Sequence, residues 1–146
     1  MSKSDTFEND LMLLLFNNTD IANIGDAGGI RGAVTPGSLY LSLHTADPGD
    51  VGTAVTNETA YTNYARQAVA RSGAGFVVTN NSVSPAANVD FPECGATPGN
   101  PITHFGVVNT TSGAGKLLYS GTVTPNVTMS QGVIPRIKST STVTED

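Results

Sequence analysis

SLYLSLHTADPG, residues 38–49, is the stretch that decides the expected fold of this chain. Apolar and polar side chains alternate along it, the period of two expected of a strand with one face on a core and the other facing water or a partner. The apolar positions are Leu39, Leu41 and Leu43, and the positions between and after them are Tyr40, Ser42 and His44. Asp47-Pro48-Gly49 then ends the strand, because proline has no N–H for the ladder and glycine tolerates a positive φ.

The composition around this strand favours an all-β chain. The 146 residues are about one domain in length, on a prior of roughly 150 residues per domain. The chain has 16 Gly, 8 Pro and no Trp, and only 13% of its residues are charged. This mixture disfavours helices and suits short strands joined by turns.

Further short strands are expected after residue 49. Residues 103–108 and 116–124 form a predicted hairpin around the turn-rich run 109–115. The other expected strands cover residues 64–71, 76–79, 82–84, 89–91, 127–129 and 133–138. About eight or nine strands at this spacing are typical of an antiparallel β-sandwich or jelly roll.

A helix is expected before the β region. Asp5 is a suitable N-cap, Glu8 completes a capping box, and the helix runs to about Phe16. Residues 11–16 are apolar most of the way round, so this helix must be covered on several sides. Two interpretations remain open: the helix is buried in its own β body, or it is an arm whose second face is buried on a neighbouring subunit.

The expected organisation has three consecutive parts. Residues 1–37 form an arm of helix and glycine-rich connector, residues 38–138 form the β-sandwich, and residues 139–146 form an acidic tail. The tail is either frayed or a final edge strand that requires a partner. Residues 47–59 show no periodicity and are expected to form a long loop with solvated acids, Asp50 and Glu58.

Charge and cysteine content exclude several classes of protein. The net charge is −5 and basic residues do not cluster, so the chain is a poor candidate for nucleic-acid binding. The apolar run 11–16 is far shorter than the roughly 20 residues that span a bilayer, so no membrane partner is expected. Cys94 is the single cysteine and no signal peptide is recognisable, which indicates synthesis in a reducing cytoplasm.

No cofactor or metal site is expected. The run SGAGK at residues 112–116 lacks both the earlier glycine and the following Ser or Thr of a phosphate-binding loop, so a hairpin turn is the better interpretation. His44, His104 and Cys94 are not at ligand spacing, and structural zinc needs four donors.

No catalytic residue is expected either. Ser42, His44 and Asp47 are close in sequence, but a strand lacks the elbow that exposes a serine nucleophile. Asp47 with Asp50 would form a glycosidase pair only by accident, so these acids are interpreted as loop charges. The chain is therefore predicted not to be an enzyme, and a glycan depolymerase that uses Asp47 or Glu58 is the least favoured hypothesis.

Segments spread over most of the chain carry a resemblance to a known family: Phe7–Leu11, Ser38–Gly49, Ala60–Arg66, Val83–Pro85, Val89–Pro92, Thr103–Gly106 and Gly113–Gly121. With these segments the chain resembles a family of small tailed-bacteriophage and prophage proteins commonly labelled tail fibre protein. The resemblance implies a structural protein of the virion that is made in the host bacterial cytoplasm.

Two roles follow from this resemblance. Small jelly-roll proteins of this kind look like capsid decoration or cement proteins, which implies a homo-oligomer bound to the major capsid protein or to other virion subunits. The alternative is a tail or tail-fibre component that touches the host surface through loops 47–59 and 109–115. The candidate contact residues in either role are Phe7, Leu11, Met12, Leu15 and Phe16 of the helix, with Tyr40, His44 and Asp47 of the first strand and its turn.

Overall fold

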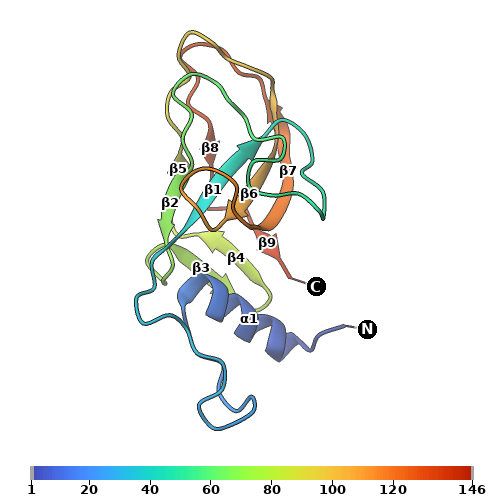
Figure 1. The fold of residues 1–146 in the computed structure, drawn as a ribbon, viewed down its shortest axis with the longest axis vertical. Helices are drawn as coiled ribbons and strands as arrows, with labels where there is room; N and C mark the ends of the chain where they lie inside the picture. The colour runs from blue at the N-terminus through green and yellow to red at the C-terminus, as the bar shows by residue number, and fades with distance from the viewer. Residues whose placement is uncertain (1, 146) are drawn as a thin grey trace. The chain divides into compact units, whose positions relative to one another are not determined.

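The computed structural model describes residues 2–145 and is mostly β, with one helix at the N-terminal end (Figure 1). The helix α1 spans Asp5–Asn17. The strands found in residues 2–145 are β1 (Ser38–His44), β2 (Gln67–Ala70), β3 (Phe76–Thr79), β4 (Ser82–Pro85), β5 (Val89–Asp90), β6 (Ile102–Val108), β7 (Leu117–Val127), β8 (Arg136–Ile137) and β9 (Val143–Thr144).

The strands form sheets of four, three and two members within the described residues. Their orders are β2-β1-β6-β7, β3-β4-β9 and β5-β8. The pairs β1–β6, β6–β7, β3–β4, β4–β9 and β5–β8 are antiparallel. The predicted β character, antiparallel pairing and N-terminal helix are thus confirmed. A jelly-roll sandwich is not confirmed, because it would need its strands in two facing sheets.

The chain forms two compact units, and each combines segments that are distant in sequence. Unit 1 consists of the described residues within 1–38, 69–88 and 138–146. Unit 2 consists of residues 39–68 and 89–137. The N-terminal segment and the C-terminal tail therefore belong to the same unit as the β3–β4 hairpin, which the sequence analysis assigned to the sandwich.

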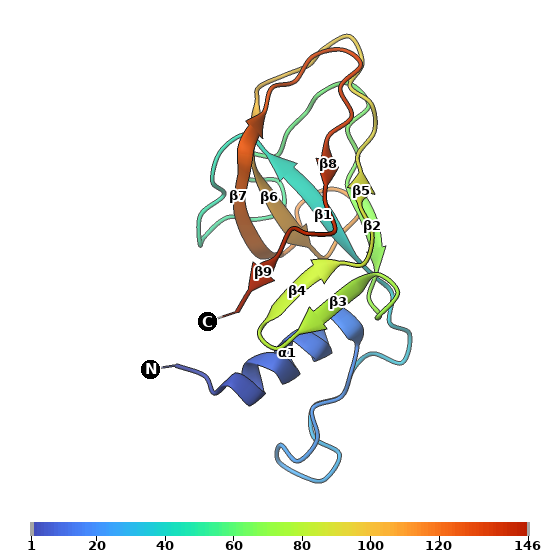
Figure 2. The same cartoon turned by 180° about the vertical axis from the view of Figure 1, so that it is seen from behind.

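In unit 1, α1 packs against the β3–β4 hairpin (Figures 1 and 2). Met12 and Phe16 are 0% and 1% exposed. The Phe16 ring meets Phe76 of β3 edge to face, with ring centroids 5.0 Å apart. Positions 12 and 16 are four residues apart and therefore lie on the same face of the helix. Because this face is buried against strands of the same chain, the packing supports the first of the two interpretations.

The helix begins one residue earlier than the sequence analysis predicted. Ser4, not Asp5, is the N-cap: its backbone is extended and its hydroxyl accepts from the N–H of Phe7 at 3.4 Å. A capping box needs Glu or Gln three residues after the cap, which is the position of Phe7 here. Glu8 lies one residue too far along to complete the box.

The C-terminal end of α1 is capped by side chains from elsewhere in unit 1. Asn18 adopts a left-handed conformation, with φ of 58°, and its backbone N–H donates to the carbonyl of Leu13. Arg71 donates from Nε to the carbonyl of Leu15 at 2.7 Å and from Nη2 to the carbonyl of Leu14. The last turn has no basic residue of its own, so Arg71 supplies the positive charge that favours a helix C-terminus.

The C-terminal tail is an edge strand in unit 1, one of the two possibilities left open by the sequence. Val143 pairs with Val83 in the β3-β4-β9 sheet (Figure 2). The side chain of Asn81 donates to the carbonyl of Glu145 at 2.9 Å, and Lys3 forms an ion pair with the Glu145 carboxylate at 3.0 Å. The partner strand that the tail required is β4 of its own chain.

In unit 2, β1 has the predicted bounds and pairs with β6 from Tyr40 opposite Val108 to His44 opposite His104. The leucine face is buried as predicted, with Leu41 and Leu43 each 3% exposed. The opposite face was predicted to meet water or a partner, and for Ser42 and His44 this was wrong, because both are 0% exposed.

Three other strands differ in length from the prediction. β2 begins at Gln67, because Tyr64 and Arg66 leave the ladder and make side-chain hydrogen bonds instead. β7 runs on through Val127, and the last predicted strand of the sandwich shortens to β8. The hairpin β6–β7 is confirmed: around its turn the side chain of Asn109 accepts from the N–H of Lys116 at 2.8 Å.

Candidate functional site

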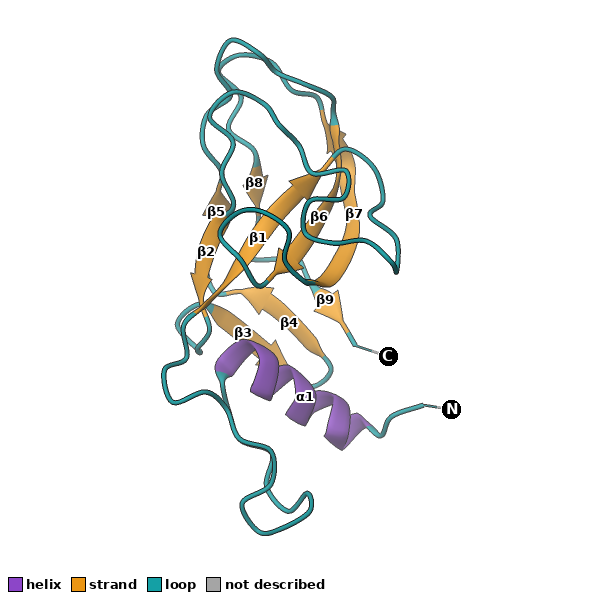
Figure 3. Cartoon of the chain, in the orientation of Figure 1, coloured by secondary structure: helices purple, strands orange, loops and turns teal. Residues whose placement is uncertain are grey.

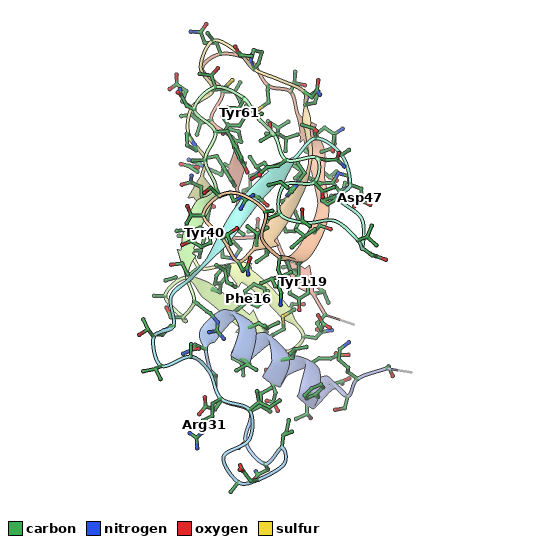
Figure 4. All side chains as sticks on the ribbon, viewed as in Figure 1. Phe16, Arg31, Tyr40, Asp47, Tyr61 and Tyr119 are labelled. Carbon is green, nitrogen blue, oxygen red and sulfur yellow. The ribbon has the colours of Figure 1, made fainter. Side chains whose placement is uncertain are left out.

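The structure places the eight predicted contact residues in two groups, surface and interior. In α1, Phe7 is 37% exposed, and Leu11 and Leu15 are half-buried. Met12 and Phe16 are buried under the β3–β4 hairpin; Figure 4 shows Phe16 between the helix and these strands. A partner therefore cannot reach the last two without displacing the hairpin.

The three residues of the first strand and its turn divide in the same way. Tyr40 is half-buried, His44 is fully buried, and Asp47 is exposed on the loop that follows β1 (Figure 4). The carboxylate of Asp47 accepts from the N–H of Gly49 at 2.9 Å, and Gly49 has φ of +69°. This confirms the predicted turn, because the short acid side chain and the glycine together fix it.

His44 and Ser42 form a hydrogen-bonded pair in the interior of unit 2. Nδ1 of His44 lies 2.8 Å from the carbonyl of Thr56, and Nε2 lies 2.8 Å from Oγ of Ser42. Since a carbonyl only accepts, Nδ1 carries the proton and the Ser42 hydroxyl donates to Nε2. Burial lowers the pKa of His44 below its ordinary value of 6.5, in keeping with a neutral ring.

The distance between Ser42 and His44 is that of a catalytic nucleophile and its base, but the pair lacks the exposure and the carboxylate partner that catalysis needs. A catalytic serine must reach a substrate, and Ser42 and His44 are both 0% exposed. Nδ1 meets the Thr56 carbonyl where a triad would have a carboxylate. The pair is therefore structural: one hydrogen bond joins Ser42 to His44 on β1, and a second joins His44 to the loop that carries Thr56.

Arg66 is the second buried polar centre of unit 2. Its side chain is 2% exposed, and Nε and Nη2 donate to the two carboxylate oxygens of Glu58, each at 2.7 Å. The Tyr64 hydroxyl donates to Glu58 Oε1 at 2.8 Å. Burial raises the pKa of Tyr64, and the hydrogen bonds from Arg66 to Glu58 raise the pKa of Arg66, so the guanidinium stays charged.

The remaining donors of Arg66 fix two loops of unit 2. Nη1 donates to the carbonyl and the hydroxyl of Thr110 at 3.0 and 2.9 Å, and Nη2 to the carbonyls of Gly113 and Ala54 at 3.0 and 3.2 Å. One guanidinium thus holds loop 45–59 and turn 109–115 in defined positions. The prediction that Glu58 is a solvated loop acid was wrong, because its side chain is only 15% exposed.

Sequence reasoning missed Arg66, which was treated as a scattered surface charge. A local signal was present: an arginine lies among the small residues of 65–70, a segment predicted to be closely covered on both faces. A buried arginine needs a carboxylate partner, and Glu58 is the nearest acid before it in the sequence.

The loop anchored by Arg66 carries exposed apolar side chains. Val51 is 97% exposed and Val55 is 45% exposed. Both valines lie on one loop, and a loop that is held in place loses little further conformational entropy on binding. Loop 45–59 is therefore a candidate contact surface of unit 2, continuous in sequence with Asp47.

A second exposed loop, residues 18–37, follows α1 in unit 1 (Figure 3). The Asn18 amide closes it by bonding both backbone groups of Ala33, at 2.7 and 2.8 Å, and Ile21 and Ile30 exchange backbone hydrogen bonds. Arg31 lies on this loop (Figure 4). Its exposed apolar side chains are Ile24, Ile30 and Val34, at 42%, 42% and 105% exposure.

The comparison with family models gives a match over almost the whole chain. Residues 2–145 match the model described as podophage GP4 fiber I protein gp80. The chain belongs to this family. No curated protein matches the chain. The family is one of phage fibre proteins, so the predicted class, a structural protein of a tailed-phage particle, is confirmed at that level.

In residues 2–145, no three His, Cys, Asp or Glu side chains lie together as a metal site would require. Over the same residues, no helix has both the length and the apolar character needed to cross a bilayer. Cys94 is a free thiol and is buried, 1% exposed.

Proposed function

We propose that this chain is a structural component of a podophage fibre and that it acts by binding other polypeptides of the particle. The observation that carries this proposal is the family match over residues 2–145, whose description names a fibre protein. The interior of unit 2 supports it, because the buried side chains of His44 and Arg66 hydrogen-bond to backbone carbonyls of the loops. In this role the exposed loops are the working surface.

The contact surface in this proposal is made of exposed apolar residues on fixed backbone. Loop 45–59 presents Val51 and Val55, and loop 18–37 presents Ile24, Ile30 and Val34. Interfaces between proteins are apolar at their centres, and each partner of a standard interface contributes about 800 Å². A subunit of a fibre uses such patches on its neighbours, and repetition about a symmetry axis would make the chain a homo-oligomer.

Decoration of the capsid is the second candidate function. It is supported by the face of α1 that the β3–β4 hairpin leaves uncovered, where Phe7 is exposed and Leu11 and Leu15 are half-buried. An apolar helix face of this kind suits docking on an assembled shell of major capsid protein. The family description favours the fibre, so decoration takes second place here.

Localisation on the particle tests the proposal directly. Antibodies raised against the purified chain, coupled to gold, are applied to intact particles of the phage that carries this gene, with gene-deleted particles as the control. Gold on the fibres is the expected result. Gold over the head facets would overturn the fibre role and support decoration, and particles without gold in either place would overturn both.

A further inference from the structure

A polar pocket of about 610 Å³ opens in unit 1 between the first turns of α1 and the turn that joins β3 to β4. The helix contributes three carboxylates and one amide to its lining, and the turn contributes two amides. These residues are Asp5, Glu8, Asp10 and Asn9 of α1, with Asn80 and Asn81 of the turn, and Thr6 of α1 lines the pocket as well. Among the described residues, no basic side chain lines this pocket.

Glu8 is the residue that distinguishes this pocket from an ordinary acidic surface. It is only 7% exposed, and within the described residues its carboxylate has neither a hydrogen bond nor an ion pair. The Glu8 carboxylate opens to the pocket, and no donor of the described residues meets it there. Glu8 does not complete the capping box of α1, so the helix end supplies no hydrogen-bond donor to its carboxylate.

Asn9, which also lines the pocket, carries an unpaired polar atom. Its side-chain oxygen Oδ1 is buried and has no hydrogen-bond partner within the described residues. Buried polar atoms of proteins are hydrogen-bonded in the great majority of cases, so an unpaired one calls for a cause. Because Oδ1 of Asn9 is itself covered, a ligand in the pocket meets the Glu8 carboxylate and not this atom.

The positive end of the helix dipole offsets only part of this charge. Asp5 and Glu8 lie in the first turns of α1, where the dipole is equivalent to roughly half of one positive charge. The carboxylates of Asp5, Glu8 and Asp10 together bring three negative charges. The pocket therefore stays net negative, and the ligand that complements it is a cation with several donors.

The lining selects an organic cation over a metal ion or a sugar. The described residues hold no group of three acids placed to coordinate a metal, although Asp5, Glu8 and Asp10 all line the pocket. Its lining includes no aromatic ring on which a sugar could stack. A guanidinium has five donors in a planar fork, which suits a carboxylate beside amide oxygens.

We propose that this pocket binds an arginine side chain of another polypeptide of the phage particle. The proposal rests on the structural role proposed above and deepens it, because it adds a charged contact to the apolar ones. The guanidinium donates to the Glu8 carboxylate, and Asp5 and Asp10 attract it from the rim. The charge complementarity of the pocket is the argument for this occupant.

The test uses a defined probe and the full chain. A blocked tetra-arginine peptide is titrated into the ¹⁵N-labelled protein, with a tetra-citrulline peptide as its uncharged control of the same shape. The expected result is that the arginine peptide shifts the amide resonances of Glu8, Asn9 and Asn81 and the citrulline peptide does not. Calcium chloride is titrated in parallel, and binding of calcium at these residues with higher affinity would overturn the proposal.

Substitutions then locate the contact. Glu8→Gln keeps the shape of the side chain and removes an unpaired buried charge, so it is expected to fold and to weaken peptide binding about tenfold, the effect of one lost charge-assisted hydrogen bond. Glu93→Gln makes the same chemical change at an exposed site in unit 2 and is expected to leave binding unchanged. Asp10→Asn provides a second pocket variant.

The outcomes separate this proposal from the function on which it rests. Peptide binding that Glu8→Gln and Asp10→Asn weaken no more than Glu93→Gln does would overturn the pocket assignment, wherever the protein lies on the particle. Specific binding by the pocket together with gold labelling away from the fibres would leave the arginine site standing and overturn the fibre role instead.

Discussion

Arg66 and Glu58 form a two-bonded ion pair inside unit 2, with Nε to Oε1 and Nη2 to Oε2 both at 2.7 Å. The Glu58 carboxylate neutralises the buried guanidinium of Arg66. The same guanidinium also donates to the carbonyls of Thr110 and Gly113. Loops 45–59 and 109–115 are therefore held by one side chain. Loop 45–59 of the proposed contact surface therefore depends on a buried residue.

Arg66→Met is expected to destabilise the protein by about 3–5 kcal/mol, because it leaves the Glu58 carboxylate and several carbonyls buried without donors. The free energy of unfolding in urea measures this. Arg31→Met is the matched control: the Arg31 side chain is 71% exposed and 3.6 Å from Asp20, so its loss is expected to cost less than about 1 kcal/mol. Equal effects of the two changes would show that the Arg66 cluster does not stabilise the fold.

A second change checks the cause of that loss. Adding Glu58→Leu to Arg66→Met is expected to recover part of the stability, because no lone charge then remains in the interior. The recovery will be incomplete, since Glu58 also accepts from the Tyr64 hydroxyl. A double variant less stable than Arg66→Met alone would contradict this account.

Stability is expected to fall as the pH is lowered below about 6.5, because His44 is neutral in the folded protein. Burial lowers its pKa from 6.5, so the unfolded chain takes up a proton at His44 before the folded chain does. The contribution is therefore fully present above pH 6.5 and is lost as the pH falls toward the lowered pKa. Urea unfolding at pH 7.5 and pH 5.5 measures the difference.

His44→Gln is expected to flatten this pH dependence, since glutamine does not titrate. His104→Gln, opposite His44 on β6, is the control and is expected to keep the decline on acidification because His44 remains. A His44→Gln variant that loses as much stability between pH 7.5 and 5.5 as the unchanged protein would show that another group causes the loss of stability on acidification.

The sequence was sufficient where the signal is local. β1 has the bounds that the leucine alternation predicted, and the Asp47 and Gly49 turn follows it because both determinants lie within three residues. The β6–β7 hairpin was predicted for the same reason. Each of these elements is specified by neighbours in the chain, so a pattern of period two and a turn signal were enough.

What the sequence did not show depends on distant partners. Ser42 and His44 are polar and were assigned to a contact face, but the loop that carries Thr56 and the glycine at position 106 complete their burial. Arg66 is buried because Thr110, 44 residues away, accepts its hydrogen bonds. No local pattern identifies such partners. The two interleaved units arise in the same way, from segments that meet only in the folded chain.

Gly106→Ala is expected to destabilise the protein by about 1–3 kcal/mol, because the added methyl overpacks the interior. A Cβ at this position would lie 2.6 Å from Oγ of Ser42 and 2.8 Å from Nε2 of His44. Gly73→Ala is the matched control, since a Cβ there meets nothing within 4 Å. Thermal unfolding of the two variants compares them, and a Gly106→Ala protein as stable as Gly73→Ala would mean that the Ser42–His44 pair moves aside at little cost.

Phe16 and Phe7 lie on the same helix and are expected to affect different properties. Phe16→Ala removes a side chain that is 1% exposed and packed on Phe76, which should cost about 3–5 kcal/mol in the free energy of unfolding. Phe7 is 37% exposed, so Phe7→Ala should change stability by less than about 1 kcal/mol.

The distinguishing measurement for Phe7 is incorporation into particles. If the uncovered face of α1 docks on the particle, as in the decoration role, Phe7→Ala is expected to reduce the amount of the protein per particle, because the alanine removes apolar area from that face while the fold is kept. Quantitative immunoblotting of purified particles, normalised to a second virion protein, measures this amount. Val77→Ala is the control, since Val77 is 49% exposed on β3, outside the face of α1 and both exposed loops. Equal incorporation of both variants would exclude α1 from the interface and leave loops 18–37 and 45–59 as the contact surface.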